Sequence, residues 1–325
     1  MSVKIQVLKL LEESRDTYLS GTSLAKKLSV SRASVWKAMQ SLRKEGYGIT
    51  GVSNKGYRLE QSGDTLCAEG IHRHIKTEGV FLVETKNLVT STNTLLREEA
   101  ARGAPEGYVL AAEAQASGKG RLGRGFHSPM GHGVYFSLIL RPKIRVAHAT
   151  LITAAAAVSA ARAIEAIFDV NVGIKWVNDL HVKGKKICGI LTEATIDMES
   201  GMVDNSVLGI GINVTQPAEG YPPELQDSAA SIVNRTSGRD SERCRLIAAT
   251  LDNFWQYYKN LPKRAFLDEY RKRSVILGRE VIIMSHDNNP LRRAIAIAIN
   301  DECGLEVRYT NGKTETLKSG EVSIV

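Results

Sequence analysis

Cysteine is scarce in this chain, and neither a long uninterrupted apolar run nor a signal sequence is visible. The 325 residues include four widely spaced cysteines without a CxxC pair: Cys67, Cys188, Cys244 and Cys303. This spacing argues against a zinc cluster and predicts free thiols in a reducing compartment. The longest apolar stretch, 149–168, carries Arg162 and Glu165, which predicts a buried helix rather than a membrane span. Because no cleavable apolar segment opens the chain, we expect a cytoplasmic protein without membrane contact.

The charge of the chain is unevenly distributed. Apolar residues make up 43% and charged residues 24%, an ordinary globular composition that excludes a disordered or fibrous protein. The length predicts two or three domains. Residues 1–62 contain eleven Lys and Arg but five Asp and Glu, so they hold +6 of the net charge of +8. A small basic segment on a nearly neutral body favours nucleic-acid contact by the first domain. The alternative is a basic face that only serves solvation.

The N-terminal region has the pattern of a helix-turn-helix. Apolar residues at helical spacing predict a first helix over residues 2–13. Thr22 or Ser23 is the expected cap of a short second helix over 24–28. A tight turn separates it from a longer, serine-capped helix over 31–45, whose Val, Met and Leu side chains recur on one face. Two short helices joined in this way form the DNA-binding motif.

A β-hairpin follows and completes a winged-helix domain over residues 1–62, with strands at 49–52 and 57–59. The N-terminal residues of the second motif helix lie nearest the base edges in such domains. The candidate DNA contacts are hydroxyl and cationic residues of that helix and a lysine at the wing tip: Ser31, Arg32, Ser34, Lys37 and Lys55. Trp36 is expected to pack inside the domain. The alternative is a winged helix that contacts proteins.

Residues 67–270 form the second predicted domain, in which strands and helices mix. The expected strands lie at 108–114, 134–140, 186–193 and 207–214, with a short one ending at Lys175-Trp176. The expected helices lie at 94–101, 149–168 and 243–260. Runs of strands joined by short turns favour an α+β domain with a mixed, mostly antiparallel sheet.

The most informative stretch is a basic glycine loop at residues 118–126. Four glycines alternate there with three cations: Lys119, Arg121 and Arg124. Glycines let the backbone approach a ligand and present amides to anionic oxygens, while the cations attract phosphate and carboxylate. The spacing mimics a dinucleotide fingerprint, but no helix pattern follows, and no Gly-Lys-Ser/Thr closes a P-loop. A flexible basic surface loop is the alternative.

Three further segments, together with Ser91-Thr92-Asn93 and this loop, define a family resemblance. They are Lys175-Trp176-Val177-Asn178-Asp179, Gly184–Leu191 and Gly209–Asn213. In this order, behind a winged helix, they resemble the biotin–protein ligases, above all the bifunctional bacterial type that is also the biotin-operon repressor. The resemblance covers essentially the whole chain. Its motifs are weak singly and specific in combination.

Four positions depart from the family pattern. Lys119 replaces an arginine and Phe126 a tryptophan in the basic loop. Lysine keeps the charge but loses the bidentate fork of arginine. Val177 stands where the family has proline, and Val325 stands where a basic residue often follows the last strand. The change at Lys119 affects how the loop orders over a ligand. The change at Val325 affects one nucleotide contact.

The resemblance implies an ATP-dependent ligase that forms biotinyl-5′-AMP and transfers biotin to a lysine of a carrier domain. It implies that Arg121 and Lys186 carry the chemistry. The biotin side is implied to consist of Ser91, Thr92, Asn93, Gln115, Lys119, Gly120, Arg121 and Lys186. The adenylate side is implied to consist of Arg121, Arg124, Trp176, Asn178 and Asn213. Mg²⁺ is expected to arrive on the ATP phosphates rather than in a protein cage, and the role of Asp179 stays open between loop support and metal binding.

Residues 275–325 look like a third domain of short strands, with a hairpin turn at Asn311-Gly312. A small SH3-like β-barrel fits this pattern and matches the family. The alternation of Ala and Ile over 294–299 places three isoleucines on one face, which predicts a structural role. The resemblance thus implies an α+β chain whose central domain is class II synthetase-like.

The implied partners are the biotin carboxyl carrier domain of acetyl-CoA carboxylase, operator DNA and a second copy of the chain, with dimerisation promoted by biotinyl-AMP. Two other functions stay open. One is a biotin-responsive regulator without catalysis, against which the retained loop cations and Lys186 argue. The other is a lipoate-type ligase, against which the winged helix and the Lys-Trp-x-Asn-Asp segment argue. Biotin-dependent pyrophosphate release from ATP separates the three.

Overall fold

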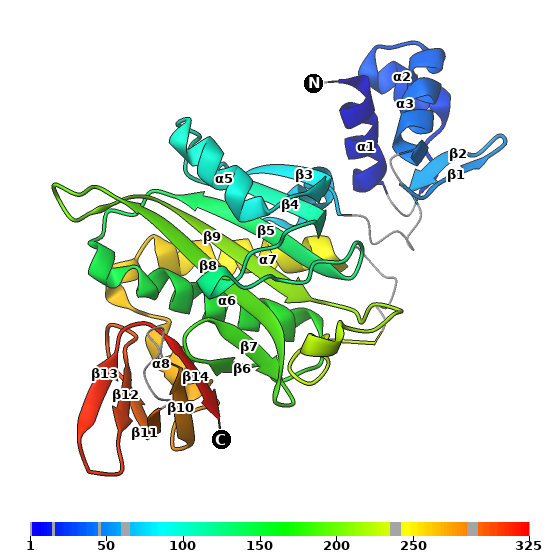
Figure 1. The fold of residues 1–325 in the computed structure, drawn as a ribbon. Helices are drawn as coiled ribbons and strands as arrows, with labels where there is room; N and C mark the ends of the chain where they lie inside the picture. The colour runs from blue at the N-terminus through cyan, green and yellow to red at the C-terminus, as the bar shows by residue number, and fades with distance from the viewer. Residues whose placement is uncertain are drawn as a thin grey trace.

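The computed structural model describes residues 2–14, 17–44, 47–59, 66–234, 242–284 and 292–324. Figure 1 shows a group of helices with a hairpin at the N-terminus, a broad sheet backed by helices, and a smaller sheet at the C-terminus. This arrangement confirms the predicted α+β class. Most of the predicted linker at 61–66, and Val325, lie outside the described residues.

The N-terminal part is a winged helix-turn-helix, as predicted. Its elements are α1 (Val3–Glu13), α2 (Gly21–Leu28), α3 (Arg32–Lys44), β1 (Ile49–Val52) and β2 (Gly56–Leu59). The Ser31 hydroxyl caps α3 by accepting from the Ser34 amide at 3.1 Å. The cap of α2 differs from the prediction: Ser20, rather than Thr22 or Ser23, accepts from the Ser23 amide at 3.0 Å. The helix therefore starts earlier than its apolar residues indicate.

The prediction that Trp36 packs inside this domain is wrong, because 54% of its surface is exposed. The inward stripe of α3 is already complete with the buried residues Val35, Met39 and Leu42. A helix buries one stripe of its surface, and the residue directly after Val35 is rotated away from that stripe. The indole therefore lies on the solvent side of α3.

A seven-stranded sheet in the order β3-β4-β5-β9-β8-β7-β6 forms the central domain. Its strands are β3 (Leu82–Val89), β4 (Tyr108–Gln115), β5 (Gly133–Leu140), β6 (Gly173–Lys175), β7 (Asp179–Val182), β8 (Lys185–Ile196) and β9 (Val203–Asn213). The β3–β4 pair is parallel, and the other neighbours are antiparallel. The predicted mixed, mostly antiparallel sheet is confirmed, with β3 and β7 as additional strands.

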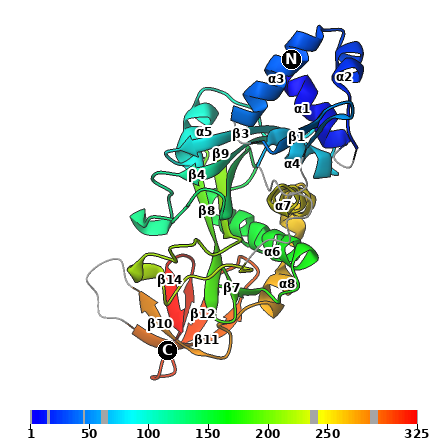
Figure 2. The ribbon, with the colours of Figure 1, turned by 90° about the vertical axis from the view of Figure 1, so that its right-hand side faces the viewer.

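Helices cover both faces of this sheet. Those on one face pack into the main hydrophobic core and are α4 (Ala68–His74), α6 (Thr150–Ile167), α7 (Glu242–Tyr258) and α8 (Leu267–Lys272). The other face is covered by α5 (Thr92–Ala101), whose Leu96 and Ala100 cluster with Leu110, Ile139 and Val207. In Figure 1, α6 and α7 lie together behind the strands, and Figure 2 shows them on the side of the sheet opposite to α5. The segment Val146–Ile167 is long and apolar enough to cross a membrane, but thirteen residues of α6 are buried in the protein core. The predicted buried helix is therefore confirmed.

The C-terminal part is a five-stranded antiparallel sheet in the order β13-β12-β11-β10-β14. Its strands are β10 (Glu280–Met284), β11 (Arg292–Ile299), β12 (Leu305–Arg308), β13 (Thr314–Leu317) and β14 (Glu321–Ile324). No pairing joins β13 to β14 in the described part of the chain, so the predicted closed SH3-like barrel is not confirmed.

The alternating segment of β11 turns a different face inward from the one predicted. Ala294 and Ala296 are buried, whereas Ile295 is 47% exposed. A bulge between Ala296 and Ala298 then shifts the register, and Ile299 becomes buried. A bulge reverses which residues face the core, so the three isoleucines do not share one buried face.

Candidate active site

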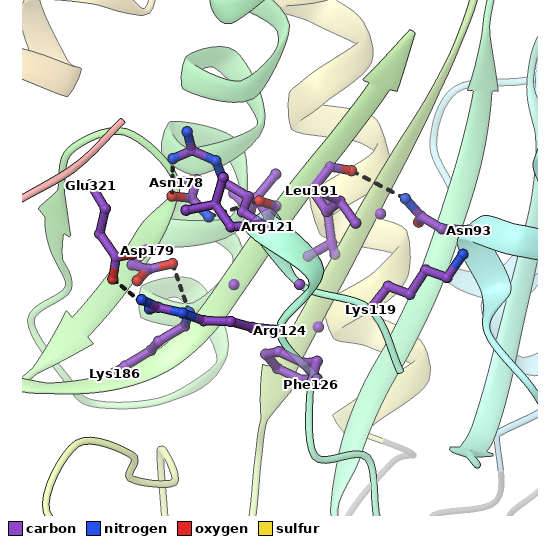
Figure 3. Close-up of a pocket in the computed structure, with 18 of the residues that line it drawn as sticks. Asn93, Lys119, Arg121, Arg124, Phe126, Asn178, Asp179, Lys186, Leu191 and Glu321 are labelled. Atoms are coloured by element: carbon purple, nitrogen blue, oxygen red, sulfur yellow. Dashed lines mark hydrogen bonds and ion pairs between the residues drawn. The ribbon is translucent and has the colours of Figure 1, made fainter. Parts of the chain in front are cut away.

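One cavity of about 270 Å³ collects eleven of the twelve residues expected to bind biotin or adenylate. Its lining includes Ser91, Thr92, Asn93, Gln115, Lys119, Gly120, Arg121, Arg124, Trp176, Asn178 and Lys186. Asn213 is the exception; its side chain instead donates to the Ala230 carbonyl at 3.2 Å. In Figure 3 the basic glycine loop crosses in front of the strands, with α6 and α7 behind them.

The floor of the cavity is made by glycines on the neighbouring strands β8 and β9. A Cβ atom at Gly211 would lie 2.5 Å from the Phe126 ring, and one at Gly189 would lie 3.1 Å from it. A Cβ atom at Gly209 would lie 1.9 Å from the Asn93 side-chain oxygen. Glycine inside a strand marks a close approach by another group. These glycines thus make room for the loop aromatic and for Asn93.

The end of the cavity beside α5 is a network of neutral hydrogen-bonding groups. The side-chain oxygen of Gln115 accepts from the Thr92 amide at 2.9 Å. Ser137, fully buried on β5, donates to Thr92 Oγ1 at 2.7 Å and is 2.6 Å from Asn93 Oδ1. Asn93 donates to Glu193 at 2.9 Å. This network fixes its side chains before any ligand arrives, which suits a polar, uncharged ring.

Ser137 and Glu193 were not singled out from the sequence. The signal for Ser137 is a hydroxyl inside the otherwise apolar run of β5. A buried hydroxyl requires a hydrogen-bond partner, so such a residue indicates a polar neighbour on the same sheet face. The partners themselves, 44 and 45 positions away in sequence, follow only from the fold.

The basic loop is folded back on itself and held at both sides. The Gly120 amide donates to the Arg124 carbonyl at 2.7 Å, and the Phe126 amide donates to the Gly118 carbonyl at 2.8 Å. Arg121 donates to the Asn178 side chain at 3.1 Å. Arg124 forms an ion pair of 2.6 Å with Glu321 of β14 (Figure 3). The C-terminal sheet thus contributes a carboxylate to the cavity, which the sequence did not reveal.

Lys186 projects into the cavity beside an acidic and an imidazole side chain. Its Nζ forms an ion pair of 2.8 Å with Asp179 (Figure 3). His181 lies directly opposite Lys186 in the β7–β8 ladder, and its Nδ1 is 3.2 Å from the Gly184 carbonyl. Burial lowers the pKa of His181, so the ring is neutral at pH 7 and donates from Nδ1. Asp179 is therefore the counter-ion of Lys186 in this structure.

Trp176 and Asn178 follow β6, and both line the cavity. Trp176 is 3% exposed, and its indole donates to the Cys303 carbonyl of the C-terminal part at 2.8 Å. Asn178 also donates to the Ile190 carbonyl at 2.9 Å. The buried Trp176 ring therefore supports the wall of the cavity. Among the described residues, no three His, Cys, Asp or Glu side chains gather as a metal site.

The fold and cavity define a ligase-type domain joined to a winged-helix head, and comparison with known families agrees. The Biotin/lipoate A/B protein ligase family matches residues 86–213. A helix-turn-helix family matches residues 3–58, and the biotin protein ligase C-terminal domain matches residues 276–325.

Individual proteins similar to this chain identify the family more closely. The bifunctional ligase/repressor BirA of Bacillus subtilis is 33% identical over 326 residues, 99% of both chains. That of Bacillus spizizenii is 36% identical over 267 residues, 82% of this chain and 81% of its own length. The biotin protein ligase of Aquifex aeolicus solved with biotin and ATP has a TM-score of 0.60 at 25% identity, covering 75% of this chain and 98% of that one. The chain belongs to the bifunctional biotin protein ligase/repressor family.

Proposed function

We propose that this protein condenses biotin with ATP to form biotinyl-5′-AMP and then transfers biotin to a carrier lysine, and that the same adenylate makes it a transcriptional repressor. The observation that supports the ligase best is the cavity itself. It sets the cations Lys119, Arg121, Arg124 and Lys186 beside a preformed neutral network. Such a site suits a ligand with a polar ring at one end and anions at the other, as in biotin and ATP.

In the first half-reaction, a carboxylate oxygen of biotin attacks the α-phosphorus of ATP. A new P–O bond forms, the bond to the β-phosphate oxygen breaks, and pyrophosphate leaves. Lys186, released from Asp179, neutralises the carboxylate and then the phosphate. Arg121 and Arg124 offset the charge that builds on the phosphoryl oxygens. Mg²⁺ enters on the triphosphate, because it prefers phosphate and water oxygens.

In the second half-reaction, a lysine amine of the carrier attacks the acyl carbon of biotinyl-AMP. An amide bond forms, the acyl–phosphate bond breaks, the amine loses a proton and AMP leaves. The proposed acceptor is the carrier domain of a carboxylase. A relative from Mycobacterium tuberculosis, 29% identical over 240 residues, is named biotin–[acetyl-CoA-carboxylase] ligase. We place this chemistry in the cytoplasm, where ATP and the acceptor are made.

Pyrophosphate release from ATP tests the ligase directly. We expect release with biotin and none with lipoate; release with lipoate alone would establish the lipoate-type ligase, and no release would establish a non-catalytic sensor. Lys186→Ala should slow adenylate formation about 100-fold, the usual loss for one charge-stabilising donor. Transfer from added biotinyl-AMP should fall less. If the rates of adenylate formation and of transfer fell equally, Lys186 would serve only to hold the biotinyl group.

The repressor role rests on coupling between the basic loop and dimerisation. Glycine-rich segments lose much conformational entropy when they are ordered, and a bound adenylate offsets that cost. The ordered surface then pairs with a second copy, and two winged helices meet two half-sites. Sedimentation with and without biotinyl-AMP tests this coupling. An unchanged association state would refute it and leave the ligase chemistry intact.

A further inference from the structure

Trp36 is the exposed tryptophan among the three of the chain. Its exposed fraction is 54%, against 3% for Trp176 and 8% for Trp255. A large indole in water carries a hydration cost that burial against an apolar partner removes. Single exposed apolar residues are common on proteins, so exposure alone assigns nothing. The position of this residue on α3 gives it meaning.

Trp36 lies on the face of α3 that points away from the domain core. Arg32, Ala33 and Lys37 are exposed on the same side, since residues three and four apart share one face of a helix. The sequence of α3 contains cations and no acidic residue. This face therefore combines positive charge with an aromatic ring and a methyl group. Its charge complements DNA, and α3 is the motif helix that enters the major groove.

The neighbouring serines are less free to contact bases. Ser31 Oγ is 2.9 Å from Ser34 Oγ and accepts from the Ser34 amide at 3.1 Å. Both hydroxyls are thus used to begin α3. In the first turns of this helix, the long side chains that are exposed are those of Arg32, Trp36 and Lys37. Arginine reads guanine or phosphate and lysine neutralises phosphate, which leaves the indole to make apolar contact.

We propose that Trp36, assisted by Ala33, recognises thymine through its C5-methyl group in the operator's major groove. The C5-methyl is the apolar feature that distinguishes thymine from the other bases there. Covering it with an indole removes apolar surface of both partners from water. One buried carbon contributes about fourfold in affinity, from the transfer free energy of a CH₂ group. This inference rests on the proposed repressor function and specifies what its motif helix reads.

The test compares thymine with deoxyuridine, which lacks only that methyl group. A duplex is first selected from a random-sequence pool with the full chain, biotin and ATP. Each thymine is then replaced singly by deoxyuridine, and dissociation constants are measured at one salt concentration. We expect about fourfold weaker binding at one or two thymines per half-site for the unaltered protein. Trp36→Ala should bind more weakly and lose the distinction at those thymines.

Lys37→Ala is the matched control on the same helix. It should weaken every duplex alike and reduce the salt dependence, because it removes a phosphate contact, while the deoxyuridine penalty remains. Trp36→Phe should restore part of that penalty, and circular dichroism checks that each variant is folded. A penalty that persists unchanged in Trp36→Ala, or one absent from the unaltered protein, overturns the thymine assignment. Failure to select any duplex overturns the repressor role itself.

Discussion

The two terminal parts of this protein are attached to the central domain in opposite ways. The winged helix has a hydrophobic cluster of its own, built from residues such as Val7, Leu24 and Met39. The C-terminal sheet shares the main cluster of the central domain through Val281, Ala296 and others. Separate cores unfold and move separately, whereas a shared core ties two parts into one unit.

Polar contacts repeat this difference. On the winged-helix side, buried Glu12 of α1 accepts from the Cys67 thiol at 3.6 Å and lies 3.7 Å from Arg73. A cavity of about 530 Å³ lies between α1, α3, α4 and β3. On the C-terminal side, a hydrogen bond and an ion pair reach residues that line the cavity of the central domain, Trp176 and Arg124. The winged helix thus has a core of its own, whereas the C-terminal sheet shares both the core and the cavity of the central domain.

The largest expected effect is at the C-terminal joint. Trp176→Ala removes a buried indole and its bond to the Cys303 carbonyl, and we expect a loss of about 3–5 kcal/mol in the free energy of unfolding. Adenylate formation should fall with it, because the cavity wall loses its support. Denaturant unfolding measures the loss. Trp36→Ala is the control and should stay within about 0.5 kcal/mol; equal losses would contradict the comparison.

The contact between Glu12 of the winged helix and the central domain should have a smaller effect on stability. Glu12→Gln exchanges a buried carboxylate for an amide beside Arg73, and we expect about 1–3 kcal/mol of destabilisation from the disturbed buried partners. Calorimetry should show the winged helix melting earlier while the main transition stays in place. Adenylate formation should be unchanged. The exposed neighbour offers the control Glu13→Gln, and a downward shift of the main transition would show that the two parts share one core.

Local patterns predicted the elements better than the contacts between them. The family resemblance located eleven of the cavity residues, because the motifs that carry it are contiguous loops or strand ends. Glu321 escaped detection, since it meets Arg124 from 197 positions away. The predicted facing of a side chain was wrong where a shift of one residue reverses it. Trp36 sits one step outside the buried stripe, and the bulge in β11 reverses the facing of its isoleucines.

The ion pair between Arg124 and Glu321 is a further link between the two parts, because it joins the basic loop to the C-terminal sheet. Both side chains are partly exposed, so the pair contributes no more than about 1 kcal/mol. We expect Glu321→Gln to speed biotinyl-AMP dissociation about two- to fivefold, because the loop loses a tether. Adding Arg124→Gln should change the rate by less than it does alone. Glu315→Gln, in an ion pair within the C-terminal sheet, should leave the rate unchanged, and additive effects would show that the tether is absent.

The smallest expected effect concerns the pH dependence of the central domain. Burial lowers the pKa of His181 in the folded protein, whereas the unfolded chain titrates near its usual value of about 6.5. Above that value both states hold a neutral ring, so the stability contribution is complete. As the pH falls below it, the unfolded chain binds the proton first, and stability is lost until the folded ring also titrates.

His181→Gln should therefore flatten the decline of the unfolding free energy between about pH 6.5 and the lower folded-state pKa, by less than one proton per molecule. Denaturant unfolding at closely spaced pH values measures that slope. His127→Gln removes a histidine elsewhere in the central domain and is the control for charge alone. We expect the winged helix, with its separate hydrophobic cluster, to melt as a separate unit, so its transition should keep the same pH dependence in both variants. A slope that His181→Gln leaves unaltered would mean that burial of this imidazole does not resist protonation, and that its ring is open to the solvent of the cavity.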